Sequence, residues 1–165
     1  MKHLITTSVL FMALSAQAEQ PRQPAQNISL DKIHIGAGLT HNNLDSPFGG
    51  DVDANGFSVF AGYELENDLP QFSTYAEVGY AQTQDFFANE DIRGLWLSTV
   101  AVKQLPEINP RLSALARFGI DLGDDDGVFM GLGAQLQLAK PVALRAEYIN
   151  KDATTVYQLS AVLSF

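Results

Sequence analysis

The end of the chain alternates strictly between two kinds of residue. Counting back from the C-terminus, every second position is apolar, and these positions are Phe165, Leu163, Ala161, Leu159 and Tyr157. The positions between them are mostly small or polar. A period of two predicts a β-strand whose faces meet different surroundings. Because chain ends of soluble domains tend to be polar and frayed, a strand that ends on an aromatic residue indicates a transmembrane β-strand.

The same alternation recurs along most of the chain. It is found in the segments 33–40, 57–65, 72–80, 92–103, 111–121, 128–138 and 142–149. Together with the last segment these make about eight strands of about ten residues, the length that a tilted strand needs to cross a bilayer. The sequence therefore predicts an all-β fold, an eight-stranded antiparallel transmembrane up-and-down β-barrel.

The connections between these segments also alternate. Those after the second, fourth and sixth segments are short and contain proline, whereas the others are mostly longer and acidic. Short periplasmic turns and longer external loops are typical of outer-membrane barrels. In the fourth segment Trp96 shares its parity with Val100 and Val102, whereas Arg93 and Lys103 have the other parity. We therefore expect Trp96 to face outward.

The N-terminal region predicts export. Residues 1–18 combine a positive start at Lys2, an apolar run from Leu4 to Leu14 and a small-x-small site at Ala16–Ala18, which is the pattern of a cleaved signal peptide. The alternative is an amphipathic first helix of a cytosolic protein. Residues 19–31 read as a flexible periplasmic lead-in, and residues 32–165 as the barrel.

Composition excludes several classes of function. The formal net charge is -9, and phosphate contacts need clustered Lys and Arg, so we expect no nucleic-acid partner. The chain has no cysteine, which excludes disulfides, thiolate metal sites and cysteine nucleophiles.

The two faces of the segments distinguish a membrane barrel from a soluble one. A soluble, lipocalin-like barrel would have an outer face rich in Lys and Glu, but the whole chain has only 10 Lys and Arg. Its polar face instead combines small residues with a few charges of both signs, which suits a narrow lumen. The other face is apolar, which suits lipid.

At this point the sequence resembles the OmpA-type family of small outer-membrane barrels, from Lys32 to Phe165. The resemblance rests on strand spacing, short proline turns and the terminal pattern of Tyr157, Leu159, Leu163 and Phe165. It implies that this pattern is a signal read by the barrel-assembly machinery, and that the chain is a barrel-only member. It also implies a lumenal ladder of opposite charges, formed here by Glu64, Glu77, Arg117, Arg145 and Glu147.

The lumenal charges are the main candidate site, because unpaired charge is costly in a low-dielectric lumen. They predict a plug that makes the barrel rigid, or alternatively the lining of a narrow pore. His34 and His41 have no acid or nucleophile at catalytic spacing. Asp124, Asp125 and Asp126 are weak metal candidates: the cluster reads as a solvated external rim, or alternatively as a divalent-cation bridge to lipopolysaccharide.

These observations predict an integral protein of the bacterial outer membrane with a structural or surface-interaction role. The alternatives are a narrow porin-like channel and, less favoured, a lipid-modifying enzyme. We expect no cofactor. The expected partners are outer-membrane lipid, lipopolysaccharide and, during biogenesis, the barrel-assembly machinery, while the sequence does not identify an external partner.

Overall fold

The computed structural model describes residues 29–45, 51–84, 91–152 and 154–165. The predicted signal peptide and most of the predicted lead-in lie outside these ranges. The described part begins with a single 3₁₀ turn, η1 (Leu30–Lys32), which leads directly into the first strand. No helix among the described residues is long and apolar enough to span a membrane.

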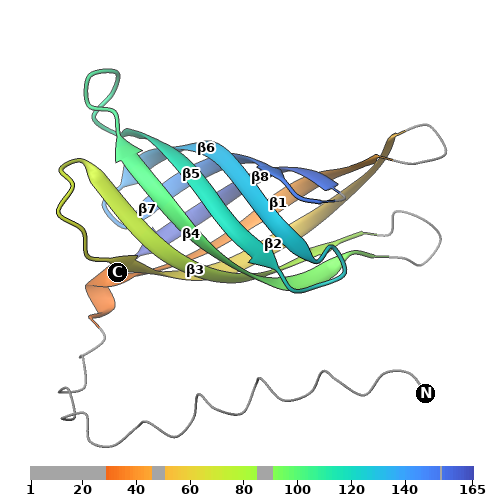
Figure 1. Ribbon diagram of the computed structural model, residues 1–165. Helices are drawn as coiled ribbons and strands as arrows, with labels where there is room; N and C mark the ends of the chain where they lie inside the picture. The colour runs from red at the N-terminus through yellow and green to blue at the C-terminus, as the bar shows by residue number, and fades with distance from the viewer. Residues whose placement is uncertain (1–28, 46–50, 85–90, 153) are drawn as a thin grey trace, which may run out of the picture.

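Eight strands follow one another along the chain. They are β1 (Ile33–Asp45), β2 (Asp51–Leu65), β3 (Phe72–Thr83), β4 (Arg93–Gln104), β5 (Leu112–Asp121), β6 (Gly127–Ala139), β7 (Val142–Asn150) and β8 (Thr154–Ser164). Each strand pairs antiparallel with the next, and β8 pairs with β1, so the sheet closes (Figure 1). The predicted eight-stranded antiparallel barrel is confirmed.

The stagger of the strands sets the width of the barrel. Neighbours in register, followed from Ile33 once around the barrel, lead back to β1 at Asn43, ten residues beyond the start. With standard strand spacing and rise, this stagger tilts the strands by about 40°. A barrel of this size has an interior that side chains fill.

The two ends of the barrel differ. At one end lie η1, the C-terminus and the short connections 66–71, 105–111 and 140–141 (Figure 1). At the other end lie the last residues of β1, β3, β5 and β7 and the first residues of β2, β4, β6 and β8. The first end is called periplasmic and the second external below, following the prediction from loop length.

Side chains alternate between the lumen and the outer wall. Large apolar side chains on the outer wall are exposed, with Leu39, Met130 and Leu132 at 74%, 60% and 67% of their full exposure. The interior side chains are small, polar or charged, together with two apolar clusters.

The expected facing of β4 is wrong. Trp96 points into the lumen and is 6% exposed, whereas its neighbours Leu95 and Leu97 are 57% and 49% exposed on the outer wall. Arg93 and Lys103 are also on this outer face, and they are the first residue and the last but one of the strand. There their long side chains reach the aqueous boundary of the membrane. The two charged residues on one face of β4 therefore did not show which face lines the lumen.

Candidate functional site in the lumen

Four charged side chains meet inside the barrel. Glu77 comes from β3, Arg117 from β5, and Arg145 and Glu147 from β7. All four lie on the inward parity of their strands and are at most 5% exposed. The two carboxylates and two guanidinium groups have a combined formal charge of zero. We call these four residues the lumenal plug.

The plug is joined by short contacts. Arg117 Nε and Nη2 donate to the two carboxylate oxygens of Glu147 at 2.8 and 3.1 Å. Arg145 Nη1 donates to Glu77 Oε1 at 2.7 Å. Arg117 Nη2 also lies 2.8 Å from Glu77 Oε2, as an ion pair without the direction of a hydrogen bond. Glu77 and Arg117 thereby connect three strands across the lumen.

Further polar side chains contact the plug. His34 Nε2 lies 2.9 Å from Glu77 Oε1, and because a carboxylate only accepts hydrogen bonds, this ring nitrogen carries the proton. Arg117 Nη1 donates to Ser98 Oγ at 3.0 Å, and Arg145 Nε donates to Gln135 Oε1 at 3.1 Å. Each guanidinium group therefore has both an ionic and a neutral partner.

An aromatic layer lies against the plug. Arg117 sits over the Trp96 ring at 4.9 Å, and Arg145 over the Phe60 ring at 5.4 Å. The Trp96 ring lies 5.9 Å from Phe60 and 6.3 Å from Phe129. Cation–π contacts of this kind stabilise a guanidinium group that is removed from water. The lumen is thus filled by charge and aromatic rings in adjacent layers.

Interior glycines make room for these groups. A Cβ atom at Gly79 would lie 2.3 Å from Trp96 Cζ2, and one at Gly62 would lie 2.3 Å from His34 Cε1. A methyl group at either position would displace the ring. The glycines of the inward face are therefore a packing requirement of the large side chains opposite them.

Glu64 lies outside the plug. It is on β2, paired in register with Tyr75, and forms no ion pair within the described ranges. At the same end of the barrel Lys32 Nζ donates to Glu66. This hydrogen bond lowers the pKa of the Glu66 carboxyl and raises the pKa of the Lys32 ammonium.

The external side of the lumen is a polar vestibule. Lys151 Nζ pairs with Asp121 and lies 6.0 Å above the Phe129 ring. Two cavities of about 20 and 30 Å³ remain here, both lined by Lys151 together with Thr40 and Asn42. Cavities of this size hold about one water molecule each. The larger of the two reaches Trp96 and Arg117 at the plug.

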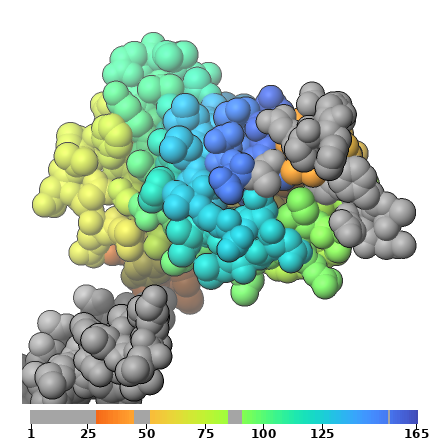
Figure 2. All heavy atoms as spheres, turned by 45° about the vertical axis from the view of Figure 1, so that its right-hand side comes forward, coloured from red at the N-terminus to blue at the C-terminus, as the bar shows by residue number. Residues whose placement is uncertain are grey.

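The three consecutive aspartates are directed to different partners. Asp125 is buried and accepts a hydrogen bond from Thr154 Oγ1 at 2.6 Å. Asp124 accepts from the backbone N–H of Arg93 at 3.1 Å, and Asp126 is exposed. Figure 2 shows this loop lying directly against the start of β4. Within the described ranges no three acidic or histidine side chains gather in a metal-binding arrangement.

The terminal pattern lies on the outer wall. Tyr157, Leu159, Leu163 and Phe165 are between 37% and 62% exposed, on the lipid-facing parity of β8 and just beyond its end. The backbone N–H of Phe165 donates to the carbonyl oxygen of Ile33 at 3.2 Å. The last residue therefore extends the seam between β8 and β1.

Sequence reasoning missed three members of the site. His34 had no acid near it in the sequence, but Glu77 reaches it from 43 positions away. Trp96 was expected outside, and Phe60 had no assigned role. The only local signal was the set of glycines at neighbouring inward positions, since each allows a large side chain opposite.

Comparison with known proteins identifies the family. Residues 4–165 match the family described as outer membrane protein beta-barrel domain. The chain belongs to this family. A comparison with curated proteins found no match.

Solved structures share the fold of this barrel. Designed transmembrane β-barrels match with a TM-score of 0.59 and 15% identity over 81% of this chain and 96% of theirs. Neisserial surface protein A matches with a TM-score of 0.54 and 14% identity over 81% and 97%. The attachment invasion locus protein of Yersinia pestis matches with a TM-score of 0.52 and 15% identity over 81% and 97%. At these identities the likeness shows the fold alone.

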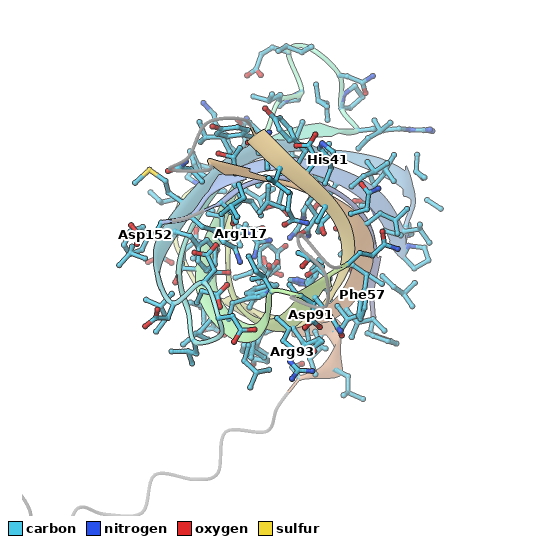
Figure 3. The ribbon with its side chains drawn as sticks, turned by 90° about the vertical axis from the view of Figure 1, so that its right-hand side faces the viewer. His41, Phe57, Asp91, Arg93, Arg117 and Asp152 are labelled. Atoms are coloured by element: carbon cyan, nitrogen blue, oxygen red, sulfur yellow. The ribbon has the colours of Figure 1, made fainter. Side chains whose placement is uncertain are left out.

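Membership of the family places the barrel in the bacterial outer membrane, as the sequence predicted. The exposed apolar wall is then the surface in contact with lipid. The lumenal plug lies inside this wall, as the view from the external end shows for Arg117 (Figure 3).

Proposed function

We propose that the protein is a closed structural barrel of the outer membrane that presents its external loops to the surroundings. The observation that carries the proposal is the complete burial of the plug, with Glu77, Arg117 and Arg145 at 0%, 3% and 2% exposure. A conducting lumen needs water along its whole length, whereas here a layer of ion pairs and a layer of aromatic rings cross it.

Conductance of the refolded protein in planar lipid bilayers tests this proposal. We expect no steady single-channel steps from the wild-type protein, because buried ion pairs and the aromatic rings beside them fill the lumen. Arg117→Glu reverses one charge of the plug. Arg111→Glu, at an exposed periplasmic turn, is its control, because it reverses a charge outside the lumen.

The channel alternative makes the opposite prediction. It is favoured by the polar vestibule around Lys151, which already extends part of the way into the lumen. Steady wild-type steps that Arg117→Glu abolishes, and that Arg111→Glu leaves unchanged, would establish the channel and overturn the closed barrel.

We do not propose an enzyme. His34 is held between Glu77 and the Tyr75 ring inside the lumen, where a membrane lipid has no access. His41, on the outer wall, contacts Asn55 and the carboxylate of Asp53. Neither arrangement contains an activated hydroxyl nucleophile.

The terminal aromatic residue is proposed to act in assembly. Phe165 is exposed on the lipid side of the seam, where an assembly partner can reach it before β1 and β8 pair. Phe165→Ser is expected to slow the appearance of folded barrel in the outer membrane of cells, measured by heat-modifiable migration. It should leave spontaneous refolding into detergent unchanged, and an equal slowing of both would contradict the assembly role.

A further inference from the structure

The outer wall is uneven near its external end. On β5 and β6 this level is entirely apolar, with Phe118, Ile120, Val128 and Met130 exposed. The other side of the barrel, from β7 through β8 and β1 to β4, carries aromatic and polar side chains at the corresponding level. These side chains, called the external band, are His41, Asn55, Phe57, Tyr80, Gln82, Arg93, Tyr148 and Tyr157, with Asp91 beside them.

The first half of the band surrounds a hollow. The Tyr148 and Tyr157 rings meet edge to face at 5.4 Å, and His41 is the neighbour of Tyr157 in register. His41 Nδ1 lies 3.1 Å from Asn55 Oδ1. A shallow groove of about 500 Å³ follows these side chains, and Ala146 also lines it. Leu39 and Leu159 line its apolar side.

The second half of the band continues across β2 and β3. Tyr80 donates to Gln82 at 3.2 Å, and Gln82 donates to Asp91 at 2.8 Å. A wider hollow runs along Asn55, Phe57, Gln82 and Asp91, and it shares Leu39 and Asn55 with the first. Arg93 follows as the register neighbour of Gln82. Figure 3 shows His41, Phe57, Asp91 and Arg93 in succession around this side of the wall.

Lipid must cover this surface, because the wall of an outer-membrane barrel faces the bilayer. A general aromatic belt would surround the barrel evenly, whereas the tyrosines and polar side chains of this level occupy one side only, opposite the apolar Phe118, Ile120 and Met130. The groups of the band match a particular headgroup chemistry. Tyrosine faces pack on the apolar faces of sugar rings, amide and imidazole groups hydrogen-bond hydroxyls, and a guanidinium group binds phosphate.

We propose that the external band binds the phosphorylated sugar headgroup of one outer-leaflet lipopolysaccharide molecule, with an acyl chain along Leu39 and Leu159. A phospholipid headgroup would use Arg93 but would offer the tyrosine faces no sugar ring to pack on. The proposal depends on the location of the barrel in the outer membrane and not on the closure of the lumen.

Native mass spectrometry of the full chain, refolded in detergent, tests the site. The probes are bisphosphorylated lipid A and phosphatidylglycerol. His41→Leu combined with Tyr157→Leu removes polar groups and one ring but keeps a lipid-compatible wall. Val128→Leu combined with Met130→Leu is the matched control on the apolar side formed by β5 and β6. Heat-modifiable migration shows that each variant is folded.

The wild-type protein and the control should retain lipid A equally, and both should prefer it to phosphatidylglycerol. The His41/Tyr157 variant should bind lipid A at least ten-fold more weakly. Arg93→Gln should weaken the binding of bisphosphorylated lipid A but not of dephosphorylated lipid A. Equal binding of both lipids by the wild type, or unchanged lipid A binding by the His41/Tyr157 variant, would overturn the proposal.

Discussion

At the scale of single residues, the interior is governed by the need to pair buried charge. Glu77 faces three donors, His34, Arg117 and Arg145, and none of the four side chains has appreciable contact with water. Desolvation makes such ions costly, and their mutual attraction and hydrogen bonds offset the cost only when every partner is present. The plug is therefore sensitive to the loss of any one charge.

Glu77→Gln tests this dependence. The substitution keeps the shape but leaves Arg145 and Arg117 with one carboxylate between them, so it should lower the free energy of unfolding by about 3–5 kcal/mol. Denaturant unfolding of the barrel in lipid vesicles measures the change. Glu107→Gln, at an exposed turn, is the control and should change stability by less than about 0.5 kcal/mol. A similar small effect of Glu77→Gln would contradict the role of the plug.

At the scale of elements, the seam between β1 and β8 closes the sheet and abolishes its edges. The two strands approach closely at Gly38, where a Cβ atom would lie 2.5 Å from the backbone oxygen of Leu159 and 2.3 Å from Ser160 Oγ. Backbone atoms of β8 cannot move away without breaking the ladder. The seam therefore requires glycine at this position.

Gly38→Val is expected to prevent closure. The folded, heat-modifiable form should be strongly reduced after refolding, because the added side chain collides with β8. Ala37→Val is the matched control, since residue 37 is the adjacent position in β1 and faces lipid. Its β-branched side chain suits a strand, and refolding should be normal. Equal refolding yields of the two variants would contradict the role assigned to the seam.

At the scale of the whole molecule, the barrel has three zones along its axis. The apolar wall spans the bilayer, the short turns lie at the periplasmic end, and the strand ends that carry Asp91, Arg93, Asp121 and Lys151 lie at the external end (Figure 1). Charge is tolerated at both ends of the wall, as Arg93 and Lys103 show, but the wall between them is apolar. The depth of a residue in the membrane therefore determines which substitutions it accepts.

Two substitutions in β6 measure this dependence on depth. Leu132→Arg, near the middle of the wall, should destabilise the barrel by about 2–4 kcal/mol, because a charge at mid-bilayer must leave water. Leu138→Arg, near the periplasmic end of the same strand, should cost about 0–1 kcal/mol. Unfolding in lipid vesicles compares the two. Equal costs would contradict the assigned position of the membrane.

The sequence predicted much of the architecture because alternation and turn chemistry are local signals. The strand count, the antiparallel order and the end of the barrel at which β1 begins and β8 ends all follow from residues close together in the chain. The charged members of the plug were also named from the sequence, because a charge on an inward parity needs a partner. Glu64 satisfied the same criterion but lies outside the plug, since parity gives the face of a strand and not its height in the lumen.

The sequence by itself determined that the chain forms a barrel with an apolar wall and a small-residue interior, since a period of two is a property of each strand alone. Tertiary structure decided which inward side chains meet. The stagger of ten residues brings Glu77 of β3, Arg117 of β5 and Arg145 of β7 to a similar height in the lumen. Glu77 therefore contacts both guanidinium groups, and it also contacts His34 of β1. Tertiary structure also decided which way Trp96 faces. In the sequence alone, Arg93 and Lys103 suggested that their face of β4 was the lumenal one. In the closed barrel they lie on the outer wall near the ends of the strand, and Trp96 faces the lumen.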